Sequence, residues 1–440
     1  MIIAVKIIIS AALAVNLASC SDKSMQIVLQ EENNAGENVS TDPLAYLEKY
    51  DVLKNYVNRE DNPVFKLGVG MTVSEFLKKN INYYIACQNF DEMTAGNAMK
   101  HSSVVRDDGS MDFSTVTAFV QAAHDAGMTV YGHTLCWHSQ QRKSYLDRLA
   151  ASAGTEQERK DVLYGALETW IAGMMGACRE NPDAEEGEDR GRMLVTAWDV
   201  VNEPMSDGRP DELKSASNQE AESVARSFYW QDYLGKEYVR YAIKYARKHG
   251  GDGLLLFVND YNLEATYNNN RKCEGLIKMI EYWESDGETR VDGIGTQMHV
   301  TYSLDPEKQR KNEMCVENML RMLAATGKLI KISELDMGLQ DKNGNDILTE
   351  DVKLWQHKAM AGYYNFIIRK YFEIIPPEQR YGITQWARTD SPKDSGWRPG
   401  LPSGIWSFGP RHLWQCCFLC VPLPLRQPQQ CWYPYALTKE

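Results

Sequence analysis

The chain has 440 residues, of which 43% are hydrophobic and 25% are charged, a composition typical of a globular protein with a large apolar core. Its formal net charge of −12 argues against a nucleic-acid partner, because no basic stripe is present to neutralise phosphates. The acidic balance suits an exported protein that acts on neutral polymers, and simple solubility explains it equally well.

The N-terminal segment predicts export. Residues 2–19 form an apolar run with one lysine, Lys6, and the run has the length of a signal-peptide core rather than of a tilted membrane span. It leads into LASC at residues 17–20, which resembles the lipobox of bacterial lipoproteins, where the cysteine thiol carries the lipid. We therefore expect a lipoprotein signal peptide over residues 1–20, lipidation of Cys20, and a membrane-anchored protein at the cell surface or in the periplasm. An ordinary cleavage site followed by an incidental cysteine is the alternative.

Residues 21–43 are polar and rich in Asn and Glu, and they predict a flexible stem. From residue 44 to residue 406, apolar β-like runs alternate with amphipathic helical patterns, which is the signature of a repeating βα fold. The strand candidates are residues 65–70, the approach to 92–97, 128–134, 194–200, 253–259, 293–299, 328–334 and 381–386.

Helical patterns separate these runs. They cover residues 74–85, 113–127, 162–178, 225–250, 272–285, 307–327 and 351–372, and Gly127 is a plausible C-cap. Eight strands and seven intervening helices over roughly 350 residues predict the α/β class and one closed (β/α)8 TIM barrel as the domain of residues 44–406. A doubly wound open sheet would show a Gly-rich phosphate turn after an early strand, and this chain has none.

Two glutamates stand at the ends of two of the apolar runs. Glu203 closes LVTAWDVVNEP directly after Asn202, and Glu334 closes KLIKISE. A polar residue just beyond a buried parallel strand marks its carboxyl end, and in a (β/α) barrel these ends form the active-site rim. A lone glutamate there is more often part of a rim salt bridge. A pair from two strands is what glycoside hydrolysis requires, with one carboxyl protonated and the other ionised.

Amide, imidazole and indole side chains follow the other strands. They include His133 and Trp137 after the third run, Gln297 and His299 after the sixth, and tryptophans around the eighth. Aromatic faces stack on pyranose rings, and imidazoles and amides bind sugar hydroxyls. Because no metal-ligand spacing or cofactor motif accompanies them, we expect a polysaccharide cleft with no metal and no cofactor.

The motifs GHTLCWHSQ, WDVVNEP, NDYN, GTQMH and SELD, in this order, resemble glycoside hydrolase family 10 over about residues 44–406. Members are mostly endo-β-1,4-xylanases with a (β/α)8 fold and a retaining mechanism. The resemblance implies hydrolysis of internal β-1,4-xylosidic bonds of xylan by double displacement, with carboxyl groups about 5–5.5 Å apart. We expect a monomer that binds xylan or xylo-oligosaccharides.

The resemblance also implies residue roles. Glu203 matches the general acid/base and Glu334 the nucleophile, and we expect the ionised Glu334 to raise the pKa of Glu203. Asn202 matches the amide that holds the sugar 2-OH. The other implied substrate contacts are His133, Gln297 and His299 at the reacting sugar, with His299 bonded to the nucleophile, Asn97 and Lys100 in the glycone subsites, and Trp137, Trp386 and Trp397 as aromatic walls.

The chain departs from the family pattern in three places. Gly96 stands where the family usually has Glu before Asn97, so a polar partner near the acid/base end is expected to be absent. The loop from Asp390 to Trp397 is longer than in many members, which affects the substrates tolerated. Residues 407–440 form an atypical tail rich in Cys and Pro, without helical periodicity, so the final helix is expected to be missing and the barrel less stable.

Two alternatives for the function remain open. A β-1,4-glucanase is one, because a glucan differs from xylan chiefly by a C6 hydroxymethyl group. A surface glycan-binding protein is the other, although it would not need both carboxylates. A barrel aldolase is disfavoured because Lys331 lies within a strand run rather than at its tip. The cysteines of the body, which we expect to be mostly free and buried, are Cys87, Cys136, Cys178, Cys273 and Cys315.

Overall fold

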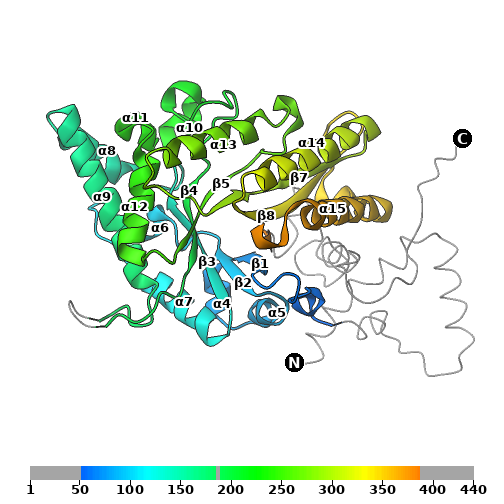
Figure 1. Cartoon of the computed structure of the whole chain (residues 1–440), viewed down its shortest axis with the longest axis horizontal. Coiled ribbons are helices and arrows are strands. Elements are labelled where there is room, and N and C mark those ends of the chain that lie inside the picture. The colour runs from blue at the N-terminus through cyan, green and yellow to red at the C-terminus, as the bar shows by residue number, and fades with distance from the viewer. Residues whose placement is uncertain (1–50, 185–188, 387–440) are drawn as a thin grey trace, which may run out of the picture.

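A closed ring of parallel strands lies at the centre of the computed structural model, which describes residues 51–184 and 189–386 (Figure 1). Each strand of the ring pairs in parallel with the next, and the last pairs with the first, which confirms the predicted (β/α)8 barrel. The ring strands are β1 (Lys66–Met71), β2 (Glu92–Ala95), β3 (Thr129–Cys136), β4 (Ala197–Asn202), β5 (Leu255–Asp260), β6 (Gly293–Thr296), β8 (Leu329–Gln340) and β9 (Arg380–Gln385).

One further strand, β7 (His299–Ser303), lies outside the ring and was not predicted. The run expected as a single strand over 293–299 ends at Thr296, and Met298 then takes a positive φ of 59° before β7 begins. β7 pairs in parallel with the second half of β8, from His299 opposite Asp336 to Ser303 opposite Gln340. The sheet therefore continues beyond the barrel rim on this side.

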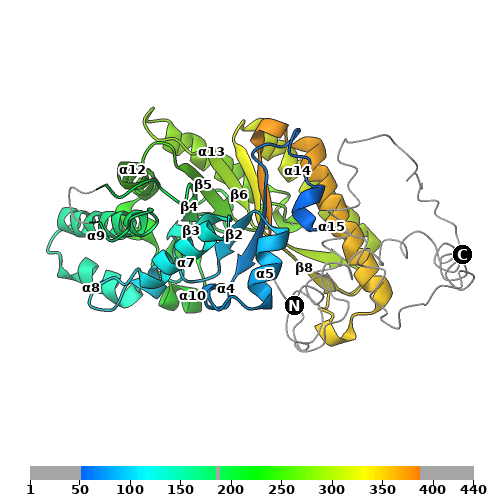
Figure 2. The same ribbon diagram turned by 90° about the horizontal axis from the view of Figure 1, so that it is seen from below.

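Helices surround the ring and cover its outer face (Figure 2). Two predicted helical stretches are interrupted. Residues 74–85 break at Lys78–Asn80, and residues 225–250 break at Ser227–Tyr229 and again from Gly235, where φ is +70°. The α-helices are α4 (Val73–Leu77), α5 (Ile81–Asn89), α6 (His101–Val104), α7 (Ser114–Asp125), α8 (Lys143–Ser152), α9 (Glu156–Ala177), α10 (Ala221–Arg226), α11 (Trp230–Leu234), α12 (Tyr238–Gly250), α13 (Arg271–Glu284), α14 (Pro306–Ala325) and α15 (Leu354–Ile374). Short 3₁₀ turns are η2 (Leu53–Tyr56), η3 (Ala216–Asn218), η4 (Thr266–Asn268), η5 (Thr349–Asp351) and η6 (Pro377–Gln379).

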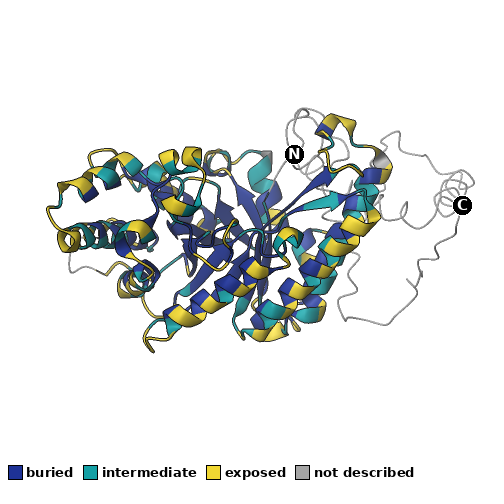
Figure 3. Cartoon of the chain, turned by 90° about the horizontal axis from the view of Figure 1, so that it is seen from above, coloured by how far each residue is buried: buried dark blue, intermediate teal, exposed yellow. Residues whose placement is uncertain are grey.

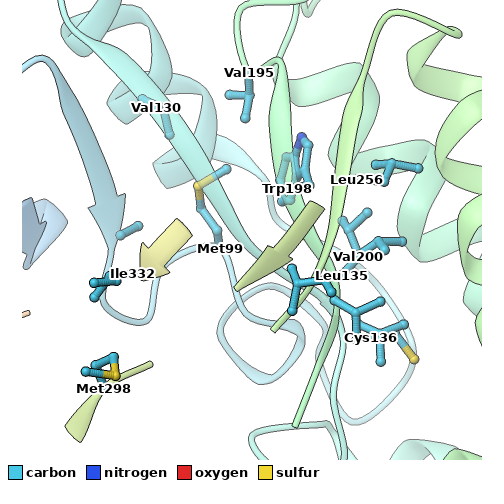
Figure 4. Close-up of a cluster of buried hydrophobic side chains, with 14 of the residues drawn as sticks. Met99, Val130, Leu135, Cys136, Val195, Trp198, Val200, Leu256, Met298 and Ile332 are labelled. Atoms are coloured by element: carbon cyan, nitrogen blue, oxygen red, sulfur yellow. The ribbon is translucent and has the colours of Figure 1, made fainter. Parts of the chain in front are cut away.

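The ring strands are buried on both faces, and the helices expose only their outer stripes (Figure 3). The main apolar core lies between the ring and the helices, where Trp198 packs near Val200 and Leu256 (Figure 4). Gly132 pairs with Trp198 across β3 and β4, and a Cβ on Gly132 would lie 2.1 Å from the indole. Glycine is therefore required at this close approach.

A buried polar group lies inside the barrel. Lys331 Nζ lies 2.6 Å from Glu92 Oε1, and Tyr381 donates its hydroxyl hydrogen to the other oxygen of Glu92 at 2.7 Å. The ammonium group also lies 3.5 Å from the centroid of the Tyr131 ring. As predicted, Lys331 sits within its strand and not at a strand tip, and its charge is neutralised there.

Several predictions lie outside the described residues: the signal peptide with Cys20, the stem, Trp397 and the missing final helix with its tail. The five body cysteines are free, and all except the half-buried Cys87 are buried, as predicted. Within the part of the chain that the structure describes, none of the helices is long and apolar enough to cross a membrane.

Candidate active site

The two predicted carboxylates lie at the carboxyl ends of strands in different parts of the ring. Glu203 follows the last residue of β4, and Glu334 lies in β8 where that strand reaches the rim. Their side chains are 15% and 7% exposed. Two amides bridge them: Asn259 Nδ2 donates to Asn202 Oδ1 at 2.9 Å and to Glu334 Oε1 at 3.3 Å, while Asn202 Nδ2 donates to Glu203 Oε1 at 3.4 Å. Both carboxylates therefore belong to one site.

The backbone of Glu203 is held in an unusual conformation. Its φ is +53°, in the left-handed region that a glutamate rarely adopts. Its N–H donates to the carbonyl oxygen of Asn259 at 2.7 Å, which ties the end of β4 to β5. Residues held in such conformations cost roughly 1–3 kcal/mol and occur mostly at functional sites.

Glu334 is paired with a histidine. His299 Nε2 lies 3.3 Å from Glu334 Oε2, and His299 Nδ1 lies 2.8 Å from Asp336 Oδ1. Burial alone would lower the pKa of His299, but its bonds to Asp336 and Glu334 and their charges raise the pKa to about 10. Burial would raise the pKa of Glu334, but the hydrogen bond from His299 and the charges of His133 and His299 outweigh it and hold the pKa of that carboxyl below its usual value. Glu334 is therefore ionised at neutral pH, as a nucleophile requires.

Glu203 has a different set of partners. Gln297 Nε2 donates to its Oε1 at 3.0 Å, Lys214 Nζ lies 3.5 Å from Oε2, and His138 Nε2 lies 3.9 Å from Oε2. Burial would raise the pKa of Glu203, but Lys214, His138 and Gln297 together lower it to about 2. Burial lowers the pKa of His138 to about 3, so its ring is neutral near pH 7 and Lys214 is the cation that acts on Glu203.

The expectation that the pKa of Glu203 is raised in the free site is therefore wrong, because the charge of Lys214, which no motif indicates, lowers it. This residue stands in the polar loop after β4 and has no motif around it. The loop returns to the rim: the Lys214 N–H donates to the Pro204 carbonyl at 2.7 Å, and Met205 forms an antiparallel bridge with Leu213. Only this non-local return places the lysine beside Glu203.

His133 lies between two tryptophans. Its Nδ1 lies 2.8 Å from Asp199 Oδ2, which fixes the ring, and it is almost fully buried. The ring centroids of Trp386 and Trp137 lie 5.8 Å and 6.3 Å from that of His133. These three predicted residues are thus brought together at the ends of β3 and β9.

On the β2 side, Asn97 and Lys100 form one hydrogen-bonded group with Gln140. Lys100 Nζ donates to Gln140 Oε1 at 2.9 Å, and Gln140 Nε2 donates to Asn97 Oδ1 at 3.0 Å. Lys100 Nζ also lies 4.9 Å from the ring centroid of Trp137. Gln140 was not predicted as a site residue, although it is the last residue of the GHTLCWHSQ motif. A Cβ on Gly96 would meet only the Met71 carbonyl oxygen, at 3.8 Å, so packing does not require a glycine there.

On the β5 side of Glu203, Tyr261 and Tyr267 both donate their hydroxyl hydrogens to Asp207. Tyr267 is 63% exposed and offers a ring to solvent, whereas Lys272 is fully buried and binds Asp207 Oδ1 at 2.9 Å. Since β5 and β3 flank β4 on opposite sides, this group and the Asn97 group lie on opposite sides of Glu203. Polar and aromatic side chains therefore lie on both sides of Glu203 at the rim.

A family model described as Glycosyl hydrolase family 10 matches residues 57–407. The chain is 28% identical over 350 residues to the endo-beta-1,4-xylanase Xyn10C of Cellvibrio japonicus, which covers 77% of this chain and 50% of that protein. It is 25% identical over 343 residues to the exoglucanase XynX of Acetivibrio thermocellus, which covers 77% of this chain and 27% of that protein. The chain thus spans half or less of the length of these two relatives.

Among solved structures, the fold is similar to that of a variant of xylanase10C from Cellvibrio japonicus in complex with xylopentaose. The TM-score is 0.66 at 23% identity, and the match covers 86% of this chain and 70% of that chain. At this identity, the structural similarity shows a shared fold.

Proposed function

The chain belongs to glycosyl hydrolase family 10, and from this premise we propose that it is a retaining endo-β-1,4-xylanase that cleaves internal bonds of xylan. The observation that carries the proposal is the pair of buried carboxylates at the ends of β4 and β8, joined through Asn202 and Asn259. Their different partners suit the two different roles that a retaining mechanism needs.

In the first step, the ionised Glu334 attacks the anomeric carbon, and Glu203 gives its proton to the glycosidic oxygen as the carbon–oxygen bond breaks. In the second step, Glu203 takes a proton from water, the water oxygen bonds to the anomeric carbon, and the ester bond to Glu334 breaks. Glu203 must take up a proton before the first step. A bound sugar excludes water from its carboxyl, and this added burial raises the pKa.

The stereochemistry of the released sugar tests the mechanism. Proton NMR during hydrolysis of a xylo-oligosaccharide should show the β-anomer first, followed by slow mutarotation. Immediate release of the α-anomer would reject the double displacement.

Action on β-1,4-glucan is the second candidate, because one relative is an exoglucanase at 25% identity. Incubation of the mature protein with xylan and with β-glucan, followed by chromatography of the products, separates the two. Internal cleavage of xylan to a ladder of oligosaccharides is expected. Dominant release of glucose oligomers would favour the glucanase, and binding without cleavage of either polymer would favour a surface glycan-binding protein.

We also propose that the enzyme is exported and anchored to a membrane through a lipid on Cys20, with residues 21–43 as the spacer. The LASC sequence supports this. Metabolic labelling with a fatty-acid analogue should mark the wild type and not Cys20→Ala. Labelling of both chains, or of neither, would reject the anchor.

A further inference from the structure

We infer that Lys214 is a positioning residue that controls the charge of Glu203 during the reaction, and this inference rests on the proposed hydrolase function. Its ammonium group favours the ionised form of the Glu203 carboxyl. Glu203 takes this form when it donates its proton in the first step, and it needs this form to accept a proton from water in the second. No family motif recognised in the sequence includes Lys214.

Lys214 is buried within the site and is not a solvent-exposed lysine near it. The Lys214 side chain is 3% exposed, with Nζ 3.5 Å from Glu203 Oε2 and 4.5 Å from the centroid of the Tyr261 ring. Burying an ammonium group costs several kcal/mol unless a counter-charge and favourable contacts offset it. The Glu203 carboxylate supplies the counter-charge, and the face of the Tyr261 ring supplies the favourable contact. The hydrogen bond from the Lys214 N–H to the Pro204 carbonyl fixes the backbone.

The neighbouring charges are already paired among themselves. Lys272, on α13, lies 2.9 Å from both Asp207 and Asp260, so its single charge faces two carboxylates. On the far side of the site, His299 is the cation that faces Glu334 and Asp336.

Lys100, after β2, also interacts with the charges of Glu203 and Glu334, but its Nζ donates to Gln140. Among the lysines that the structure describes, Lys214 is the one within ion-pair distance of Glu203. His138, on the loop after β3, stacks on Tyr229 at 5.4 Å between ring centroids and is neutral near pH 7 because burial lowers its pKa to about 3. Burial and the neighbouring Lys272 also lower the pKa of Lys214, and the charges of Glu203, Asp260 and Asp207 counter this.

The chemical consequence differs for the two limbs of the pH profile. The basic limb of kcat, where the first step limits turnover, reports the loss of the proton that Glu203 must donate in the enzyme–substrate complex. Its acid limb reports protonation of Glu334, whose pKa is lowered by His299 and His133 and not by Lys214. Removing the Lys214 charge should therefore move the basic limb to higher pH and leave the acid limb in place.

The test compares Lys214→Met and Lys214→Arg with the wild type. A matched control is Lys328→Met, which removes another partly buried lysine that pairs with a glutamate, Glu284, at 2.8 Å, at the opposite end of β8. An opposite charge at this distance typically shifts a carboxyl pKa by about one to three units. We expect the basic limb of kcat on xylohexaose to move to higher pH by about that much in Lys214→Met, and to stay near the wild-type position in Lys214→Arg and Lys328→Met.

Carbon-13 NMR of glutamate-labelled protein gives a readout that does not need activity. The Glu203 carboxyl signal, assigned by its loss in Glu203→Gln, should titrate at higher pH in folded Lys214→Met than in wild type. A lowered kcat with both limbs and the NMR titration unmoved would overturn the inference and leave Lys214 a structural residue. A wild type without activity on xylan and β-glucan would instead reject the proposed function, and the NMR titration would still decide the role of Lys214.

Discussion

Each carboxylate of the site has its own cation, and the two cations come from different kinds of structure. His299 begins a strand, and its partner Asp336 is directly opposite in the register of β7 and β8. Lys214 comes from a loop that returns to the rim. The ionised state of Glu334 is therefore built into the sheet, whereas the state of Glu203 depends on a contact that a loop supplies.

This asymmetry predicts different effects of deleting each carboxylate. Glu334→Ala should reduce activity to background on every substrate, since no nucleophile remains. Glu203→Ala should lose about 10²–10⁴-fold on xylan, but much less on an aryl xylobioside whose leaving group needs no proton. Added azide should accelerate turnover of that variant by replacing water as the nucleophile. Steady-state kinetics on both substrates check this, and equal losses for the two variants would contradict the assignment.

The pairing of His299 also predicts a dependence of stability on pH. Its pKa is raised to about 10 in the folded protein, compared with about 6.5 in an unfolded chain. Because the folded pKa is higher, the stabilisation is fully present below about pH 6.5 and is lost as the pH rises through about 10. Urea unfolding at pH 7 and pH 10 should show a larger fall in the free energy of unfolding for wild type than for His299→Gln. Parallel falls would show that the pairing does not stabilise the fold.

At the scale of elements, Gly132 on β3 lies close against a large side chain of the neighbouring ring strand, Trp198 on β4, as Gly293 on β6 does against Phe257 on β5. Gly132→Ala should lower the free energy of unfolding by about 1–3 kcal/mol, because the added methyl overlaps the buried indole. The control is Gly165→Ala on the exposed face of α9, where an added Cβ meets nothing within 4 Å. That substitution should raise stability by about 0.5–1 kcal/mol, since glycine is unfavourable within a helix. Urea unfolding measures both, and equal effects would contradict the packing argument.

The ring strands could be predicted from the sequence because a strand buried on both faces is a continuous apolar run, a local signal. β7 could not, because HVTYS is short and partly polar and forms only where β8 extends past the rim. The residues of the site divide in the same way. Glu203 and Glu334 directly follow apolar runs, whereas Lys214 reaches its partner through a loop path that no local pattern encodes. Gln140 ends the GHTLCWHSQ motif and could have been singled out from it.

At the scale of the whole molecule, the ion pair inside the barrel connects strands that are far apart in the sequence. Lys331 on β8, Glu92 on β2 and Tyr381 on β9 meet there, and the first two are nearly inaccessible to solvent. Such a pair stabilises the closed ring only while both charges are present, because a single buried charge lacks compensation.

Lys331→Met should therefore destabilise the protein by about 3–5 kcal/mol, and the double variant Lys331→Met with Glu92→Leu should recover part of this loss. Urea unfolding of the two single variants and the double variant gives the coupling energy directly. Additive losses in the double variant would show that the two side chains do not act as a pair. Activity at low temperature should persist in all three, since none of them touches the carboxylates at the rim.

β8 continues six residues past Glu334, to Gln340, and β7 pairs in parallel with this extension. One side of the rim around the carboxylates is therefore made of hydrogen-bonded strands, while the side that carries Lys214 is loop. Amide hydrogens of Asp336–Gln340 should exchange with deuterium only through large, cooperative openings, and those of residues 207–213 through small local ones. We expect a polymer bound between these two sides to contact one rigid side, which sets the position of the bond to be cut. The other side is more mobile and adjusts to the shape of the polymer.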